Sequence, residues 1–390
     1  AYLMEKPKDK KDDAAKPEET PEEKPENSAA QGETPAQTPA GAGQKKDNKK
    51  KDKDKKEEGT PLVLRNLATG AQTQFEHAVE YVFSEDGRWL AYTASDKEGK
   101  ADGAYAVETA TGKVWSLLTG KGAYKQLAFD EAGRQLAFVS NRDDVDADEP
   151  RFKLYHWRTG AAALQVLAAE GTRGMPQGWR VSKDGALEFS RQGRRLFFGT
   201  VPAPAPDALE DLLDDEKPVL DVWNWRDPLL QPQQLKQLDA EKKRSYRAVA
   251  HLESRSPRIV QLATEAMPEI TVGAEGEADV ALANSDVPYR QRITWDTRYS
   301  DVYLIDVNTG QARRVLEELR GTATLSPRAR YLTWWNGYER AWYALAVRGG
   351  APVKVSAGIP HPLQDELHDR PEAPDAHGSA GWTRDDAEFL

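Results

Sequence analysis

The stretch Phe83-Ser84-Glu85-Asp86-Gly87-Arg88-Trp89-Leu90-Ala91-Tyr92 decides the fold, because it recurs along the chain. An apolar strand ends at Phe83, a Ser-x-Asp-Gly turn follows in which glycine supplies a positive φ, and a second apolar strand begins. In each copy the first apolar residue and the key apolar residue of the next strand are seven positions apart. The further copies are Phe129–Phe138, Phe189–Phe198, Leu325–Leu332 and Trp382–Phe389.

A second signature follows the hairpins, in which an alternating apolar strand ends at a Thr-Gly pair and another strand begins. The pairs are Thr69-Gly70, Thr111-Gly112, Thr159-Gly160 and Thr309-Gly310. Two hairpins per unit make a four-stranded sheet, and the units recur every ~40–60 residues, the period of propeller blades. The chain shows neither βαβ alternation nor a sustained helical heptad.

The predicted fold class is therefore all-β: a β-propeller of four-stranded blades, about seven or eight in the intact protein. We expect the ring to be incomplete at both ends of this chain. Residues 1–6 would form a strand of the first blade, 7–59 a disordered Lys/Glu/Pro-rich insertion, and 60–390 the propeller, with its last blade truncated. The insertion carries 13 Lys and 14 acidic residues but no Val, Ile, Leu, Phe, Trp or Tyr, so burial cannot offset its ordering entropy.

Composition excludes several classes of protein. The formal net charge of −10 argues against nucleic acid as a partner, for which a basic stripe is expected. No run approaches the ~18 apolar residues of a membrane span, and no apolar stretch typical of a signal peptide is present. The chain has no cysteine, which rules out disulfides, thiolate catalysis and cysteine-ligated zinc.

No catalytic or metal-binding motif stands out. A serine nucleophile elbow needs Gly-x-Ser-x-Gly on a strand-to-helix turn, and the nearest stretch, His377-Gly378-Ser379-Ala380-Gly381, has His in place of the first Gly. We interpret it as a loop. His361, His368 and His377 lie near carboxylates, but their spacings match no known zinc pattern. We predict no catalytic residue, no metal site and no cofactor in this chain.

Two features of residues 202–228 have alternative interpretations. Residues 207–216 are expected to form a short helix with leucines on one face and six acidic residues elsewhere. We favour the interpretation that this helix is a solvated part of a surface insertion. The alternative is an acidic patch that captures a cationic group such as a peptide amino terminus. Trp223 and Trp225 are two positions apart, so they share one face of a predicted strand. This pattern favours core packing of an outer strand over ligand stacking.

The hairpins, together with the runs Asp221–Pro228 and Pro288–Asp296 and the stretch Ala380–Asp386, resemble the propeller of large bacterial prolyl-oligopeptidase-family serine peptidases. The resemblance covers nearly all of residues 61–390. It implies an α/β-hydrolase domain in the same polypeptide, which would hold the Ser–His–Asp triad and is absent from this chain. In dipeptidyl-peptidase relatives, acidic residues on a propeller helix hold the substrate amino terminus, so Asp214, Asp215 and Glu216 are the candidate substrate-binding residues.

The resemblance thus predicts a non-catalytic propeller that gates and positions peptide substrates for a serine peptidase. By family analogy, a periplasmic or secreted location is expected. The generic blade hairpin is also shared with TolB-like propellers. The alternative is accordingly a non-catalytic scaffold that binds a protein or peptide over its face.

Overall fold

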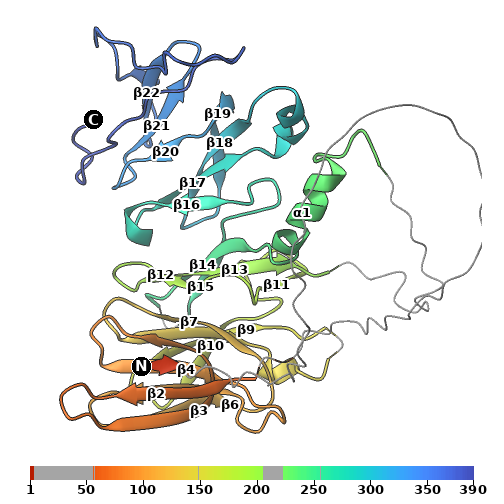
Figure 1. Cartoon of the computed structure of the whole chain (residues 1–390), viewed down its shortest axis with the longest axis vertical. Helices are drawn as coiled ribbons and strands as arrows, with labels where there is room; N and C mark the ends of the chain where they lie inside the picture. The colour runs from red at the N-terminus through yellow and green to blue at the C-terminus, as the bar shows by residue number, and fades with distance from the viewer. Residues whose placement is uncertain (4–55, 57, 148, 205–222, 255) are drawn as a thin grey trace, which may run out of the picture.

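The computed structural model describes residues 1–3, 56, 58–147, 149–204, 223–254 and 256–390. Their strands form antiparallel sheets that follow one another along the long axis of the molecule, from β2–β6 at one end to β20–β22 at the other (Figure 1). The fold is the predicted one, a propeller-type array of four-stranded blades.

The first sheet holds two blades, because β3 is long enough to serve both. Its order is β1-β2-β3-β4-β5-β6, in which β2 pairs with the first half of β3 and β4 with the second half. The strands are β1 (Tyr2–Leu3), β2 (Thr60–Arg65), β3 (Gln72–Phe83), β4 (Trp89–Ala94), β5 (Gly103–Glu108) and β6 (Val114–Thr119).

Four further sheets form blades three to six. Blade three contains β7 (Tyr124–Phe129), β8 (Gln135–Ser140), β9 (Lys153–Arg158) and β10 (Leu164–Ala168). Blade four contains β11 (Trp179–Val181), β12 (Glu188–Phe189), β13 (Arg195–Pro202), β14 (Tyr246–His251) and β15 (Arg258–Gln261). Blade five contains β16 (Ile270–Val272), β17 (Val280–Ser285), β18 (Tyr299–Asp306) and β19 (Ala312–Arg320). Blade six contains β20 (Thr324–Leu325), β21 (Tyr331–Asn336), β22 (Ala341–Ala346) and β23 (Val353–Lys354).

Short helices lie between the strands. The α-helix α1 (Gln231–Lys242) precedes β14, and it buries none of its residues. The 3₁₀ helices are η1 (Arg142–Asp144), η2 (Ala274–Gly276) and η3 (Val287–Thr294). The turn between β16 and β17 therefore contains a helical turn, η2.

The seven-residue offset of the repeat has a direct structural meaning. In all five copies the two apolar residues are cross-strand partners, and the pairs are Phe83↔Leu90, Phe129↔Leu136, Phe189↔Leu196, Leu325↔Leu332 and Trp382↔Phe389. The turn between them needs a left-handed residue, which is glycine in the first three copies. Ala329 and Asp386 adopt the same conformation in the last two, with φ of 54° and 59°.

The core lies between consecutive sheets, because each sheet buries apolar side chains from both of its faces. Blades two and three share Trp89, Leu136 and Trp157, and the rings of Trp89 and Trp157 meet edge to face with centroids 5.3 Å apart. Other clusters join blades three to four, four to five, and five to six.

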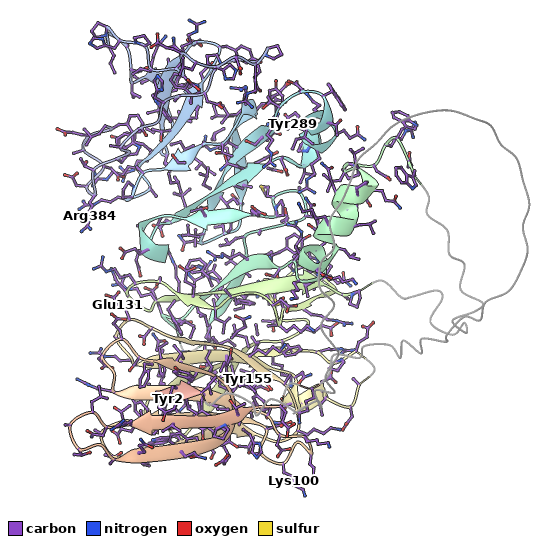
Figure 2. All side chains as sticks on the ribbon, in the orientation of Figure 1. Tyr2, Lys100, Glu131, Tyr155, Tyr289 and Arg384 are labelled. Carbon is purple, nitrogen blue, oxygen red and sulfur yellow. The ribbon has the colours of Figure 1, made fainter. Side chains whose placement is uncertain are left out.

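The connections fall on two opposite faces. What we call the turn face is formed by the hairpin turns 84–88, 130–134, 190–194, 326–330 and 383–387. What we call the loop face is formed by 95–102, 141–152, 223–245 and 286–298, which link second to third strands. Figure 2 shows Glu131 and Arg384 on the turn face, and Tyr289 on the opposite side with α1.

Candidate functional site: a cavity on the loop face

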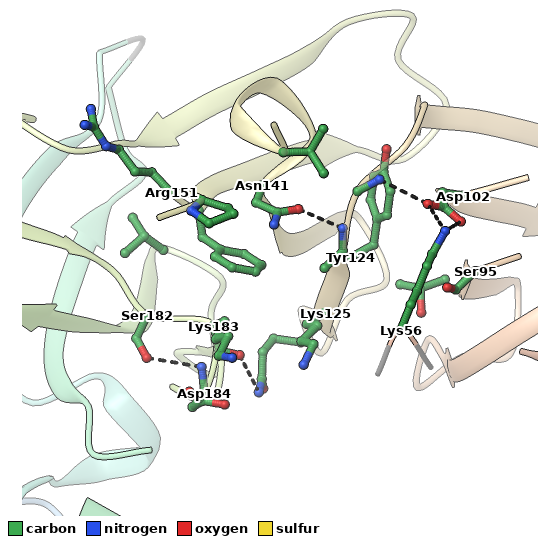
Figure 3. Close-up of a pocket in the computed structure, with 18 of the residues that line it drawn as sticks. Lys56, Ser95, Asp102, Tyr124, Lys125, Asn141, Arg151, Ser182, Lys183 and Asp184 are labelled. Atoms are coloured by element: carbon green, nitrogen blue, oxygen red, sulfur yellow. Dashed lines mark hydrogen bonds and ion pairs between the residues drawn. The ribbon is translucent and has the colours of Figure 1, made fainter. Parts of the chain in front are cut away.

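A cavity of ≈ 970 Å³ opens on the loop face where blades two, three and four meet. Its walls come from β3, the β4–β5 and β8–β9 connections, the start of β7, and β11 with the residues after it (Figure 3). Concave sites at the junction of several elements are the usual places for ligands. The cavity is therefore the candidate binding site of this chain.

Asp102 fixes one wall of the cavity. Its carboxylate is fully buried and accepts hydrogen bonds from Lys56 Nζ at 2.8 and 2.7 Å, and from the backbone N–H groups of Asp96 and Gly122 at 3.0 Å each (Figure 3). A buried charge is tolerated only when it is paired and hydrogen-bonded. Asp102 therefore ties three separate segments together at the edge of the cavity.

Two β-bulges shape the opposite side. The register of β3 shifts between Ala78 and Glu80, and that of β7 shifts between Lys125 and Ala128. Gln126 takes a left-handed φ of 64° inside β7, a conformation that costs energy for a residue other than glycine. Bulges of this kind re-aim side chains, and they place Glu80, Lys125 and Gln126 on the cavity wall.

Hydrogen bonds link the segments that surround the cavity. Gln126 Nε2 donates to the carbonyl of Lys183 in blade four at 3.3 Å. The N–H of Ala123 donates to Asn141 Oδ1 at 2.7 Å, and the Tyr124 hydroxyl donates to the Gly120 carbonyl at 2.7 Å. Burial raises the pKa of Tyr124, so its phenol stays neutral near pH 7. The wall is consequently rigid before any ligand arrives.

Basic side chains outnumber acidic ones in the cavity lining, although the chain has a net charge of −10. Nine basic and five acidic side chains line it, and four of the basic ones also pair with carboxylates outside the lining. The basic residues are Lys56, Lys97, Lys121, Lys125, Arg151, Arg180, Lys183, Lys242 and Arg244, and the acidic ones are Glu80, Glu98, Asp102, Glu149 and Asp184.

The described lining includes Ser95 and Ser182 but no histidine, so it contains no Ser–His pair.

A second feature of the loop face is a group of exposed tryptophans, here called the tryptophan ridge: Trp223, Trp225 and Trp295. They are 70, 83 and 70 % exposed. The Arg226 guanidinium lies over the Trp225 ring at 5.0 Å from its centroid. The Arg226 carbonyl accepts a hydrogen bond from Gln291 Nε2 of η3 at 2.5 Å, which joins the two chain segments that carry the ridge.

The tryptophan ridge corrects one prediction. Core packing of Trp223 and Trp225 in an outer strand is wrong, because both rings face solvent and residues 223–228 contain no strand but a turn at 225–226. Asn224 is the cause: its side-chain Oδ1 accepts from the Arg226 N–H at 3.0 Å, and its carbonyl accepts from the Asp227 N–H at 3.0 Å. Local hydrogen bonds of this kind compete with strand pairing.

The predicted substrate-binding residues Asp214, Asp215 and Glu216 lie outside the described residues, as does the acidic helix predicted for 207–216. Among the described residues, the histidines do not gather with carboxylates into a set of three or more metal ligands. No helix in the same residues is long and apolar enough to cross a membrane.

Sequence reasoning missed the residues of the cavity. Lys125, Asp102 and Arg180 lie in different blades, and no local motif connects them. One signal was present: Asp102 is an isolated carboxylate directly before the apolar strand Gly103–Glu108, a position that calls for a partner once it is buried.

No protein-family model and no curated protein matches the chain. Among solved structures, it is similar to TolB from Acinetobacter baumannii at 11 % identity and a TM-score of 0.30, covering 74 % of this chain and 61 % of that one. It is similar to the β-propeller domain of the Trilobed protease from Pyrococcus furiosus at 13 % identity and a TM-score of 0.33, covering 77 % and 78 %. It is similar to Porphyromonas gingivalis dipeptidyl peptidase 4 at 13 % identity and a TM-score of 0.37, covering 72 % and 39 %. The assignment as a propeller rests on the chain's own sheets.

Proposed function

We propose that this chain is the non-catalytic propeller of a prolyl-oligopeptidase-family serine peptidase, and that its loop face positions peptide substrates for an α/β-hydrolase domain of the same polypeptide. One observation carries the proposal. Two sequence runs carry the resemblance, and the described residues 223–228 of the first are joined to the second, Pro288–Asp296, on the loop face by the bond from Gln291 to the Arg226 carbonyl. When residues distant in sequence come together on one surface, their arrangement indicates a shared role at that surface.

The cavity supports the same proposal. With a volume of ≈ 970 Å³ it has room for several amino-acid residues. Its wall combines the aromatic rings of Phe152 and Tyr124 with charged groups. A propeller that holds a peptide in this position contributes orientation rather than chemistry. The hydrolase domain would supply acyl transfer through its own Ser, His and Asp.

The tryptophan ridge is the surface we assign to the hydrolase domain. Large exposed aromatic side chains are enriched at protein interfaces, and Trp225 and Trp295 are both mostly exposed in the described chain. Docking at the ridge would bring the catalytic domain next to the cavity, because α1 follows the segment that carries Trp225 and ends at Lys242, which lines the cavity.

The test begins with the encoding gene. If its full product contains a Gly-x-Ser-x-Gly elbow, that product should react with a fluorophosphonate probe and hydrolyse fluorogenic peptides, whereas the 390-residue chain should do neither. In the full product, the double variant Trp225→Ala/Trp295→Ala should lose at least about tenfold in kcat/KM. Leu67→Ala, which removes an exposed apolar side chain in the β2–β3 turn, is the control.

A gene that ends without such an elbow would overturn the peptidase proposal. The TolB-like scaffold would then be the better explanation, and the cavity would be its binding site.

A further inference from the structure

The charges of the cavity point to a class of ligand. Three of its five acidic side chains already have cationic partners: Asp102 pairs with Lys56 at 2.7 Å, Glu149 with Arg180 at 2.9 Å, and Glu98 with Lys100 at 2.6 Å. Four of the basic lining residues pair in turn with carboxylates outside the lining: Lys121 with Asp146, Arg151 and Arg180 with Glu170, and Arg244 with Glu241. Lys97, Lys125 and Lys242 form no ion pair with a described carboxylate, so they are the cations that a ligand can meet.

Lys125 is the cation best placed to meet a ligand. Its side chain projects from the bulge of β7 and lies at the cavity in Figure 3. It forms no ion pair with a described carboxylate, and the strained φ of Gln126 maintains the bulge that directs it. Strained backbone persists where the surrounding structure holds it, and it clusters at ligand sites.

Arg180 provides a second, more rigid cation in blade four. It lies on β11, and its side chain is only 16 % exposed. Glu149 holds its Nη1 at 2.9 Å, so the guanidinium is oriented before a ligand arrives. Between these cations, Tyr124 and Phe152 are both buried and give the wall its apolar part.

We propose that the cavity binds acidic peptides through carboxylate side chains, with Lys125 as the principal contact. The inference rests on the proposed peptide-positioning function and adds the substrate class. A carboxylate flanked by apolar residues matches cations set beside Tyr124 and Phe152. A nucleic acid matches less well, because the phosphate backbone would be repelled by a chain of net charge −10.

The test is fluorescence anisotropy with the 390-residue chain and two labelled, end-blocked heptapeptides, Ala-Glu-Ala-Phe-Ala-Glu-Ala and its Gln-for-Glu isostere. The Glu peptide should bind at least about fivefold more tightly at ~50 mM salt, and the gap should narrow at ~500 mM because the ions screen the pair. Lys125→Gln should bring the Glu peptide to within about twofold of the isostere.

Lys236→Gln is the matched control, since Lys236 lies on α1 outside the cavity and is exposed. It should leave both affinities unchanged, and circular dichroism should show that both variants are folded. Equal binding of the two peptides to the parent chain would overturn the acidic preference while peptide positioning stands. Binding of neither peptide would overturn both. A preference for Glu that survives Lys125→Gln would overturn the assigned contact.

Discussion

The turn face and the loop face come from the same strands but are built in opposite ways. On the turn face, near-identical hairpin turns bond to the next blade: Ala274 donates its N–H to the Pro327 carbonyl at 2.9 Å, and Ser326 Oγ donates to Asp386 at 2.5 Å. On the loop face, connections of unequal length carry a cavity and exposed aromatic side chains. One face holds the blades together, which leaves the other free to vary and to bind.

The largest effect on stability is expected at Arg195, a buried residue on the turn side of blade four. It tests whether the turn face holds the blades together. Its guanidinium donates to the carbonyls of Gly276 at 3.2 Å and Ala278 at 2.6 Å and pairs with Asp279, all in blade five. Arg195→Ala should lower the free energy of unfolding by about 3 kcal/mol, because it leaves those carbonyls and Asp279 without their partner. Urea denaturation measures the change.

The adjacent Arg194 is the control, since it is exposed and lies 3.8 Å from Glu253. Arg194→Ala should cost less than about 0.5 kcal/mol. Similar losses for the two variants would mean that the turn face does not join blades four and five.

The dependence of stability on pH tests the hydrogen bond between His156 and Gln135, which lies beneath the turn face. Burial lowers the pKa of His156 from 6.5 to about 4, and its Nε2 lies 2.9 Å from Gln135 Oε1. Between about pH 4 and pH 6.5, the unfolded chain therefore binds a proton at His156 that the folded chain does not. The stabilisation is fully present above pH 6.5 and is lost as pH falls toward 4, by about 2 kcal/mol.

The variant His156→Gln should flatten that part of the stability–pH curve in thermal unfolding. It will retain a smaller slope, because burial also lowers the pKa of His251. A curve identical to that of the parent chain would show that His156 does not contribute.

A pair of glycines isolates the contact between turns. Gly193 and Gly160 both have a left-handed φ, 68° and 79°, but a Cβ at Gly193 would lie 2.6 Å from Gln135 Nε2, whereas Gly160 faces open space. Gly160→Ala should cost about 1 kcal/mol from the backbone alone, and Gly193→Ala about 2 kcal/mol. Equal losses in chemical denaturation would contradict packing between neighbouring turns.

The smallest effect is expected on the loop face. Trp225→Ser should change the free energy of unfolding by no more than about 0.5 kcal/mol, because the ring is 83 % exposed. A large loss of stability in the same denaturation assay would mean that the tryptophan ridge supports the fold and is not held free for a partner.

Much of the fold was predictable because its information is local. The pairing of Phe83 with Leu90 follows from the turn between them, and the same offset recurs in every copy. Turn chemistry, strand propensity and apolar alternation agree within about ten residues, which is the range in which sequence patterns are informative.

The candidate site was not predictable in the same way. Lys125 reaches the cavity because of a bulge, and Asp102 is buried because Gly122 and Lys56 arrive from other segments. The bulge has no local sequence signal, and the position of Asp102 before an apolar strand indicates that it needs a partner without identifying that partner. The two tryptophans were misplaced for a related reason: their alternation suggested a strand, but the side-chain hydrogen bond of Asn224 favoured a turn.

The shared strand β3 has a mechanical consequence. Its 12 residues bond to β2 along one half and to β4 along the other, so one uninterrupted strand belongs to both blade one and blade two. Blades two and three are instead linked by the short connection between Thr119 and Tyr124. A pulling force that reaches β3 would pass along this one strand from blade one into blade two. In an optical-tweezers trace the first two blades should therefore rupture as one event, and each later blade should extend in its own step.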